Sequence, residues 1–453
     1  MDTARLLPLV MVLLLMSGGC VPTVQSAELP SLASQTWSGQ SESPTSANAR
    51  LAELLNVPEL GRLTSQALAN NSDIRIGSAR VEQSRALLRA ARLAVLPAIS
   101  LAAGSSTRTA RTGRNPLDFT NAFAGLDVAI DPDLFGRLKA GKRAAVSRVR
   151  AAKLQQDAIA LAVEADVALA YVQRAAIAKR IAILEINIAR AVDLDRVIRV
   201  RSAEGAATRV DQGLQSIRLL SLREEGSRLS QALDQTRTAL AILTGSEAPQ
   251  FSVAAANLDA IAIPRLEPLP PADVLSARPD VRAAEASMQA AQGDVALARA
   301  AFFPRIGITI QALFETATGG PLGTSLNLGS SLLAPIFSRG RLTSELQFVS
   351  AVQLEAVERY RQTILAALAE VEDARIAGGR SFERAKLLDT IVDEARLTAR
   401  LANVQYIEGE EDLQNVLDAE TSLSRAEDAQ AVGRLERLFA GIALYRSMGG
   451  YHK

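Results

Sequence analysis

The sequence has very few of the side chains that carry most enzyme chemistry. Its 453 residues include a single histidine, His452, and a single cysteine, Cys20. A Ser-His-Asp triad or a histidine–cysteine metal cluster is thereby almost excluded. A disulfide within the chain is impossible, because one cysteine has no partner. We therefore predict a protein that is not an enzyme and that uses no metal or other cofactor.

The chain also has almost no net charge, few aromatic residues and, beyond the N-terminal region, no long apolar segment. It has 50 basic and 49 acidic residues, and this balance argues against a nucleic-acid partner, which would need a basic face. Aromatic residues make up only 4%, and the composition is typical of long helices. Beyond the N-terminal region no segment is long and apolar enough for a transmembrane helix. A mature chain that crosses a membrane must therefore do so with strands.

The N-terminal region is typical of a secreted lipoprotein. A short apolar run leads to Ser17 and two glycines directly before Cys20. This pattern predicts a signal peptide over residues 1–19 and resembles a bacterial lipobox, in which the thiol is acylated and becomes the first mature residue. Ser17 stands where the lipobox usually has Leu, so ordinary signal cleavage nearby is the alternative. Val21 rather than Asp follows the cysteine, as is general for outer-membrane lipoproteins, and residues 20–50, rich in Ser, Pro, Gln and Thr, are expected to form a lipid-anchored tether.

The remainder of the chain is an internal duplication. Segment 73–97 is matched by segment 280–304, each running from an Asp to a Pro, and four of the positions between them are among the identical pairs: Arg75/Arg282, Ala79/Ala286, Ala91/Ala298 and Arg92/Arg299. Both prolines are expected to stop a helix. We therefore predict a first structural repeat over residues 51–260 and a second over residues 261–453.

Each repeat contains two segments that predict strands. Apolar residues recur there with a period of two, which is the signal of a half-buried strand. Glycine and proline between and after these segments predict turns. The predicted strands cover residues 99–103 and 122–130 in the first repeat, and residues 306–312 and 325–333 in the second.

Very long helices follow the strands in both repeats. No proline interrupts either region, and apolar residues recur at helical spacing. Residues 138–201 and 341–407 are each predicted to form a helix, the first of them about 95 Å long at 1.5 Å per residue. Gly378 and Gly379 are expected to interrupt the second. Because these helices are rich in alanine and lack a thick apolar face, they suit close packing in a thin-walled tube or a coiled coil.

The small number of strands has a consequence for assembly. Four strands per chain cannot close a barrel, and an open sheet edge cannot lie in lipid. The smallest membrane barrels have about eight strands. Several chains must therefore share one barrel around a common axis, which the long helices would also line. The predicted fold is mainly α with a membrane β part: a long α-helical barrel joined to a β-barrel to which each chain gives four strands.

Two segments of the second repeat carry a resemblance to a known family. Residues 275–309 read LSARPDVRAAEASMQAAQGDVALARAAFFPRIGIT, and residues 334–342 read APIFSRGRL. They resemble the TolC-like outer-membrane efflux proteins, in particular the lipoprotein branch of NodT and OprM type that serves RND pumps. The first copy departs more, since Asn71 and Ser72 stand before Asp73 in place of Arg-Pro.

This resemblance implies an assembly and a function. The assembly is a homotrimer with a twelve-stranded β-barrel, a long α-helical barrel, and a belt to which the chain ends and residues 378–379 contribute. The partners are a periplasmic adaptor protein, an inner-membrane RND-type pump and outer-membrane lipid. The function is passive export of small molecules such as drugs or toxic compounds, as the exit duct of a tripartite efflux pump. The duct is lipid-anchored in the bacterial outer membrane and extends into the periplasm.

The resemblance also implies roles for the turns after the long helices, which in the family hold the closed end and dock the adaptor. Tyr406, Asp211 and Asp418 match positions of the periplasmic gate. A hydrogen bond from Tyr406 to Asp211 is the expected latch, and a ring of Asp418 side chains would attract cations. The residues assigned to the tip turns and to adaptor docking are Gly205, Thr208, Gly409, Glu410 and Glu411. Asn415 replaces the first aspartate of the family pattern, and Glu411 stands where the family often has a basic residue.

Other interpretations of the same pattern remain open. The acidic residues at the second turn also fit a solvated helix–turn surface without a gating role. An outer-membrane duct of a protein-secretion or metal-export system would share the fold. A surface coiled-coil structural protein would explain the helices but neither the paired strands nor the duplication. A periplasmic adaptor would show one helical hairpin flanked by β domains rich in Gly and Val, which this sequence lacks.

Overall fold

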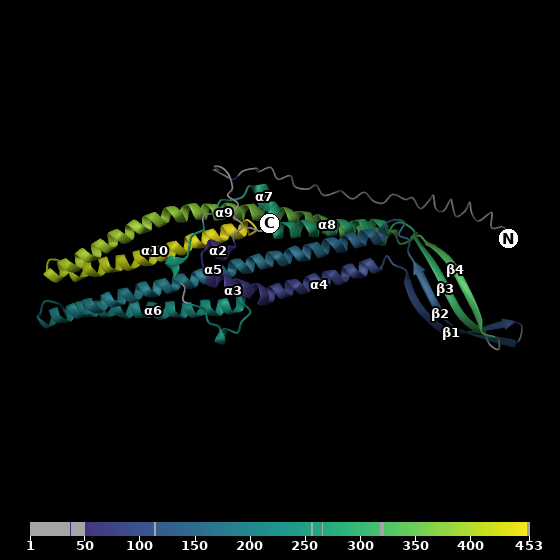
Figure 1. Cartoon of the computed structure of the whole chain (residues 1–453), viewed down its shortest axis with the longest axis horizontal. Helices are drawn as coiled ribbons and strands as arrows, with labels where there is room; N and C mark the ends of the chain where they lie inside the picture. The colour runs from purple at the N-terminus through teal and green to yellow at the C-terminus, as the bar shows by residue number, and fades with distance from the viewer. Residues whose placement is uncertain are drawn as a thin grey trace. The chain divides into compact units, whose positions relative to one another are not determined.

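The computed structural model describes residues 37, 50–112, 115–254, 257–264, 266–317 and 321–450. Cys20, the predicted signal peptide, nearly all of the predicted tether and His452 lie outside the described residues. Within them the chain is mainly helical and contains one four-stranded sheet (Figure 1). None of the described helices has a stretch long and apolar enough to span a bilayer.

The first half of the chain has the predicted order of helix, two strands, long helix and returning helix. Its elements are α2 (Leu51–Leu54), α3 (Pro58–Asn70), α4 (Ser72–Leu93), β1 (Ala98–Thr112), β2 (Asn115–Ile130), α5 (Arg137–Ala203) and α6 (Arg209–Leu243). Two short 3-10 helices, η2 (Ala248–Gln250) and η3 (Leu258–Ala260), follow.

The second half repeats this order, as Figure 1 shows along the colour gradient. Its elements are α7 (Pro271–Ala277), α8 (Pro279–Ala300), β3 (Arg305–Ala317), β4 (Gly323–Leu333), α9 (Arg339–Glu408) and α10 (Leu413–Ser447). The four predicted strands are confirmed, and β1 and β2 extend well beyond their predicted bounds.

Proline and a capping aspartate set the helix boundaries around the sheet. α4 and α8 both end shortly before Pro97 and Pro304, as predicted. α5 begins after Asp133, which has a positive φ of 48°. The Asp133 carboxylate accepts hydrogen bonds from the backbone N–H groups of Leu138 (2.8 Å) and Lys139 (2.9 Å). These bonds satisfy donors that the first turn of an α-helix leaves open.

The four strands form one antiparallel sheet in the order β1-β2-β3-β4. The pairing of β2 with β3 joins the two halves of the chain, and β1 and β4 each have one partner among the described residues. Two cross-strand rows on one face are apolar: Leu101, Leu126, Ala312 and Leu326, and then Ile99, Val128, Ile310 and Leu328. The row between them points to the opposite face and is polar: Ser100, Asp127, Gln311 and Asn327. The sheet therefore has one apolar and one polar face over this region.

The two long helices are continuous. α5 has 67 residues and α9 has 70. α9 runs through Gly378 and Gly379, so the predicted interruption at these glycines is wrong. Nothing lies within 4 Å of the position that a Cβ would take at either glycine. A glycine inside a helix lowers its stability by about 1 kcal/mol relative to alanine, which is too little to break a helix of this length.

The contacts within the chain divide it into two units, each of which draws on both halves of the sequence. One unit contains residues 79–154 and 282–363 and therefore includes the sheet. The other contains the described parts of residues 32–78, 155–281 and 364–453.

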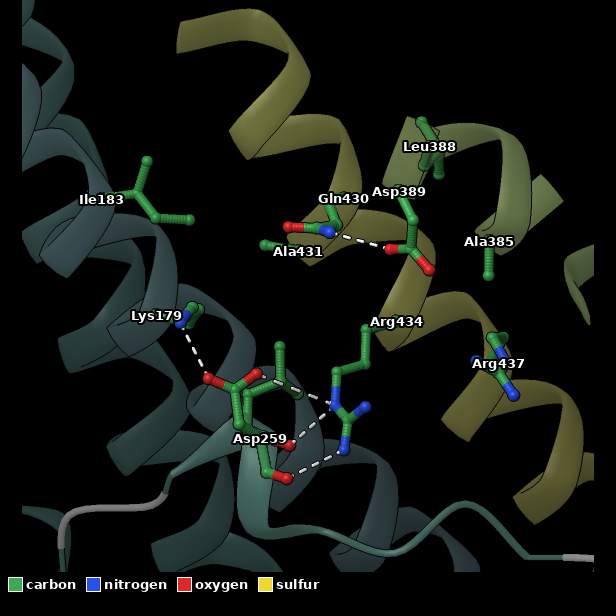
Figure 2. A pocket seen from close by; sticks show the side chains of 11 residues that line it. Lys179, Ile183, Asp259, Ala385, Leu388, Asp389, Gln430, Ala431, Arg434 and Arg437 are labelled. Atoms are coloured by element: carbon green, nitrogen blue, oxygen red, sulfur yellow. Dashed lines mark hydrogen bonds and ion pairs between the residues drawn. The ribbon is translucent and has the colours of Figure 1, made fainter. Parts of the chain in front are cut away.

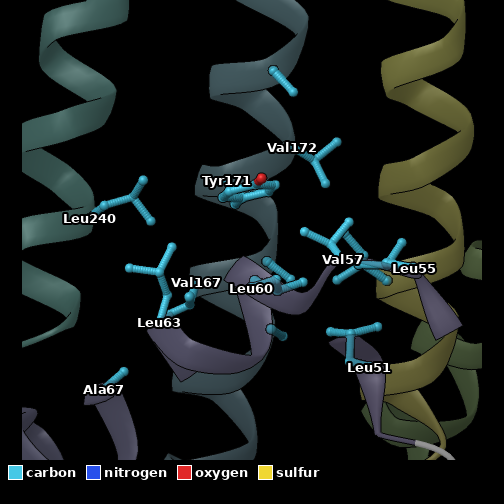
Figure 3. Packing of buried hydrophobic residues seen from close by; sticks show 14 of the residues in the cluster. Leu51, Leu55, Val57, Leu60, Leu63, Ala67, Val167, Tyr171, Val172 and Leu240 are labelled. Carbon is cyan, nitrogen blue, oxygen red and sulfur yellow. The ribbon is translucent and has the colours of Figure 1, made fainter. Parts of the chain in front are cut away.

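The largest apolar core lies in the second unit (Figure 3). Leu60 and Leu63 of α3 are fully buried against Val167 and Val172 of α5, and Leu240 of α6 completes this side of the core. Buried alanines in the same part of α5 allow the neighbouring helices to approach closely. The N-terminal helices therefore anchor the long hairpin of the first half.

Candidate functional site

The two long helices end at glycines in the same way. After α5, Gly205 has a φ of +73°, and the N–H of Ala206 donates to the carbonyl of Arg201 (2.7 Å). After α9, Gly409 has a φ of +84°, and the N–H of Glu410 donates to the carbonyl five residues earlier (2.9 Å). A left-handed glycine with this hydrogen bond is the Schellman motif, which closes a helix. Both glycines are exposed, so these turns are accessible in the single chain.

The returning helix of the first half begins with a capping box. The Thr208 hydroxyl accepts from the N–H of Asp211 (3.2 Å). The Asp211 carboxylate in turn accepts from the N–H and the hydroxyl of Thr208 (2.7 and 2.8 Å). Asp412 occupies the equivalent position before α10 and has no side-chain capping bond. Asp211, predicted as a gate residue, is therefore engaged in starting α6.

A buried apolar cluster joins the two hairpin ends, here called the tip cluster. Its members come from α5, α9 and α10: Leu194, Ile198, Tyr406, Leu413, Val416 and Leu417. Ile198 and Val416 are fully buried, and Tyr406 is 4% exposed. The turns of the two halves of one chain are thereby packed together.

Arg201 connects the two hairpins inside the tip cluster. Its guanidinium donates a hydrogen bond to the backbone carbonyl of Tyr406. The same guanidinium lies over the Tyr406 ring, 4.5 Å from the ring centroid, in a cation–π contact. Arg201 therefore holds both the backbone and the side chain of the residue that the sequence predicted as the latch.

A second arginine makes a similar contact from α6. Arg218 donates to the carbonyl of Leu417 (2.7 Å) and to the Thr421 hydroxyl (3.1 Å), both in α10. Burial lowers the pKa of Arg218, and the nearby Glu420 carboxylate opposes this shift. Two guanidinium groups from the first half thus bind carbonyls of the second half close to the turns.

The pKa of Tyr406 is affected by Asp211, which the sequence predicted as its partner, and by Arg201, which it did not. Burial raises the pKa of the Tyr406 phenol above its ordinary value; Arg201 lowers it, and Asp211 raises it further. The expected hydrogen bond from Tyr406 to Asp211 is not among the contacts of the described residues, and the Asp211 carboxylate accepts from Thr208. Besides its apolar packing in the tip cluster, the Tyr406 ring is in contact with the Arg201 guanidinium.

The raised pKa of Tyr406 gives a testable pH dependence. The folded tip holds the phenol protonated more strongly than the unfolded chain does, so tip stability is full below pH 10, the ordinary pKa, and falls as pH rises through the raised pKa. Channel conductance should therefore rise at alkaline pH, and Tyr406→Phe should remove that rise while keeping the ring. Tyr360→Phe is the matched control, because Tyr360 lies on the same helix and also has a raised pKa. An alkaline rise that persists in Tyr406→Phe would contradict the assignment.

The acidic residues near the second turn are exposed or half-buried and make only local contacts. Gln414 donates to the Asp418 carboxylate one turn further along α10 (3.2 and 3.3 Å). Asn415 donates to Glu411. Asp418 is thus exposed on the surface of α10, and its predicted role in a ring depends on other copies of the chain.

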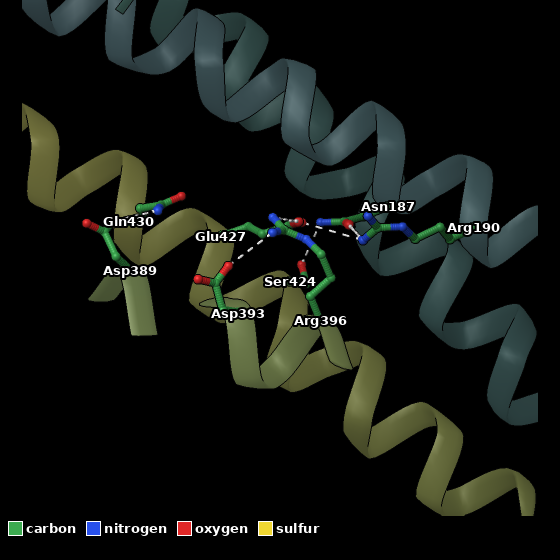
Figure 4. Close-up of polar contacts among 8 residues, drawn as sticks. All are labelled: Asn187, Arg190, Asp389, Asp393, Arg396, Ser424, Glu427 and Gln430. Atoms are coloured by element: carbon green, nitrogen blue, oxygen red, sulfur yellow. Dashed lines mark hydrogen bonds and ion pairs between the residues drawn. The ribbon is translucent and has the colours of Figure 1, made fainter. Parts of the chain in front are cut away.

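Further along the hairpins, a polar network connects three long helices (Figure 4). Asn187 of α5 donates to the Ser424 hydroxyl of α10 (3.0 Å). Glu427 of α10 is 9% exposed and lies between Arg190 of α5 (3.5 Å) and Arg396 of α9 (3.4 Å). Sequence reasoning missed this network, because its members are far apart in the chain and each fits a solvated helix surface when considered alone.

A cavity lined by charged side chains lies between α5, α9, α10 and η3 (Figure 2). The Arg434 guanidinium donates to the carbonyls of Leu258, Asp259 and Ile261 at 3.0, 3.0 and 2.9 Å. Lys179 forms an ion pair with the Asp259 carboxylate (2.7 Å). These contacts attach η3, which lies between the two halves of the chain, to α5 and α10 near the middle of the hairpins.

Comparison with proteins of known sequence gives consistent relatives. The chain is 30% identical to the pyoverdine export outer membrane protein OpmQ of Pseudomonas putida, an alignment that covers 98% of this chain and 96% of the relative. It is 29% identical to the toluene efflux pump outer membrane protein TtgI from another strain of Pseudomonas putida, with 96% of both chains covered.

Comparison with solved structures agrees. The outer-membrane channel OprN superposes with a TM-score of 0.87 at 26% identity, over 94% of this chain and 99% of that one. A family profile described as outer membrane efflux protein matches residues 63–246 and 271–450, the two halves of the duplication. The chain therefore belongs to the outer membrane efflux protein family and is the outer-membrane channel component of an efflux system.

Proposed function

We propose that three copies of this chain form a closed exit duct that works with a periplasmic adaptor and an inner-membrane RND-type pump. The observation that carries the proposal is the two-faced sheet with an open edge on either side. In the single chain its apolar face is exposed: Leu101 is 78% and Leu328 is 77% exposed. Such a surface fits contact with lipid, whereas the opposite polar row fits a water-filled lumen.

Closure of the sheet requires other copies of the chain. Unpaired N–H and C=O groups at the edges of β1 and β4 cannot remain unsatisfied in hydrocarbon. Pairing of β1 with β4 of the next copy satisfies both edges at once, and a head-to-tail contact of this kind closes into a ring. Three copies give twelve strands, enough for a barrel with a lumen.

The hairpin turns are proposed as the periplasmic gate. Tyr406 and Asp211 are proposed as gate residues, with Tyr406 held in the closed tip by Arg201 rather than by a hydrogen bond to Asp211. Asp418, exposed on α10, would face the same residue of the other copies around the shared axis and favour cations at the closed end.

The adaptor is proposed to dock at the exposed turns. Gly205, Thr208, Gly409 and Glu410 are exposed and Glu411 is half-buried, so none is hidden within the single chain. The cargo is proposed to be small organic molecules, like the pyoverdine and toluene in the names of the relatives. The pump would select the cargo, because a wide water-filled duct discriminates weakly between small molecules.

Cys20 is proposed to carry the lipid anchor of the mature chain. Radiolabelled palmitate should be incorporated into the wild type and not into Cys20→Ser, since no other cysteine is present. Equal labelling of the two proteins would contradict the assignment.

The duct itself is tested by purification from outer membranes, measurement of the oligomeric mass and recording in a planar bilayer. The expected result is a mass of three chains and a conductance that rises when the tip contacts are removed. A monomer without conductance, also after Arg201→Ala, would overturn the proposal.

A further inference from the structure

The transition from sheet to helices carries a band of exposed apolar residues. The strand register places Ala98, Ile130, Arg305 and Leu333 at the same edge of the sheet. The exposed large apolar residues that follow or precede this edge are Leu96, Leu134, Phe135, Phe303, Ile336 and Phe337. The rings of Phe135 and Phe303 stack with a centroid distance of 5.0 Å. Girdles of aromatic residues flank the apolar band of membrane β-barrels, and these phenylalanines lie at the corresponding edge of the sheet.

A groove between α5 and α8 starts at this aromatic pair. Phe135, Phe303, Arg299, Gln292 and Ala296 line its first part. Gln292 and Ala296 also line its second part, so the two parts are continuous. All of these residues belong to the unit that contains the sheet.

The second part of the groove has a floor of small residues. Gly293 of α8 faces Ala144 of α5 so closely that a Cβ on Gly293 would lie 2.9 Å from the Ala144 Cα. The two helices therefore touch beneath the groove, and the small side chains of Ala140 and Ala296 leave space above the contact.

Three cations surround this second part of the groove, and Arg299 is a fourth, exposed cation in the first part. Lys139, Lys142 and Arg143 of α5 line the groove and are exposed. Among the described residues none of the three is in an ion pair. The acidic side chains close by on α8 have other partners: Asp294 binds Arg148 (2.5 Å), and Glu285 accepts from Gln289 (3.0 Å). The groove thus has an aromatic end beside the sheet, bordered by Arg299, and a second end on the helices with three cations that form no ion pair among the described residues.

We propose that this groove binds a phospholipid with an anionic headgroup at the inner edge of the outer membrane. The acyl chains would lie along the apolar band and the aromatic pair, and the phosphate would lie among Lys139, Lys142 and Arg143. Charge complementarity selects the anionic headgroup, because basic residues next to a bilayer attract anionic lipid. The apolar and cationic ends follow one another in the order that a lipid presents them.

The test uses the full-length protein, purified and delipidated in detergent. Phosphatidylglycerol or phosphatidylcholine is added, and bound lipids per oligomer are counted by native mass spectrometry. The triple variant K139Q/K142Q/R143Q should lose phosphatidylglycerol affinity about tenfold or more, since each cation near a membrane surface contributes to binding. Phosphatidylcholine should bind weakly to both proteins.

One control variant and a second groove variant keep the result specific. R80Q/R150Q/K153Q removes three exposed cations outside the groove from the same unit, and its phosphatidylglycerol affinity should stay within about twofold of the wild type, because charges away from a bound headgroup are screened. Ala296→Trp fills the exposed floor without changing charge and should also weaken binding. Equal binding by the triple variant, equal loss in the control variant, or no effect of Ala296→Trp would overturn the proposal.

The cationic part of the groove could instead bind a soluble anion from the lumen rather than a lipid headgroup. If the triple variant changes the ion selectivity of the channel while phosphatidylglycerol binding is unchanged, the groove faces the water passage and the lipid proposal is wrong. The inference rests on the proposed membrane position of the sheet, so oligomeric mass and conductance are recorded on the same samples. A monomer that does not conduct even after Arg201→Ala would contradict the proposed duct, whereas a trimer that conducts after Arg201→Ala but whose phosphatidylglycerol binding the triple variant leaves unchanged would contradict only the groove.

Discussion

Arg201→Ala should open the channel. The substitution removes a cation–π contact worth about 1 kcal/mol and a charged hydrogen bond worth about 1.5 kcal/mol, both made to Tyr406. A loss of about 2.5 kcal/mol corresponds to roughly a 70-fold shift in the equilibrium between packed and separated hairpin ends. The open fraction in planar bilayers should therefore rise at least about tenfold.

The neighbouring arginine provides a matched control. Arg199 lies two residues earlier on α5, is 72% exposed, and pairs with Asp195 one turn away (2.7 Å). It touches neither α9 nor α10 in any described contact, and an exposed pair of this kind contributes less than about 1 kcal/mol. Arg199→Ala should leave conductance unchanged.

Further variants separate charge from geometry. Arg201→Lys keeps the cation but loses the planar guanidinium that stacks on the ring, so an intermediate conductance is expected. Tyr406→Phe keeps both the ring and the carbonyl that Arg201 contacts, so near neutral pH it should conduct like the wild type. If Arg201→Ala and Arg199→Ala have the same conductance, Arg201 does not hold the tip closed.

Much of the architecture could be predicted from the sequence because its signals are local. Strand periodicity around Ile99 and Ile306, and the prolines at positions 97 and 304, report residues that are neighbours in the chain. The interruption predicted at Gly378 failed for a physical reason: the helix penalty of a glycine is small, whereas proline also removes a hydrogen bond and clashes with the preceding turn.

The tip was predicted less completely. The resemblance placed Tyr406 and the two turn glycines, but the capping role of Asp211 was readable from the pattern Thr-x-x-Asp and was missed. Arg201 and Arg218 gave no local signal, because the carbonyls that they bind lie about 200 residues away, in the other half of the chain. Contacts between the two halves depend on how the hairpins pack, which periodicity within each hairpin does not report.

The pairing of β2 with β3 should be the most sensitive point of the sheet. Gly125 in β2 is buried, and a Cβ at this position would lie 2.1 Å from the carbonyl oxygen of Ala312 and 2.8 Å from the Cα of Leu313. Both are backbone atoms of β3, so no side-chain rotation can relieve the overlap. Gly125→Ala should therefore separate the two β-hairpins or shift their register. The free energy of unfolding should fall by more than about 4 kcal/mol, because a tightly packed backbone must move.

Loss of this pairing should abolish the channel while leaving the helices. Far-UV circular dichroism should keep its helical signal, because the long hairpins have their own apolar clusters. The amount of oligomer recovered from outer membranes, and with it the conductance, should fall about tenfold or more. Gly323→Ala is the matched control in β4, where a Cβ would meet the Glu315 carbonyl oxygen at an ordinary 3.7 Å. Wild-type levels of conducting oligomer from Gly125→Ala would mean that β2 and β3 do not lie in this register in the membrane, and the single sheet from which the duct is inferred would lose its central pairing.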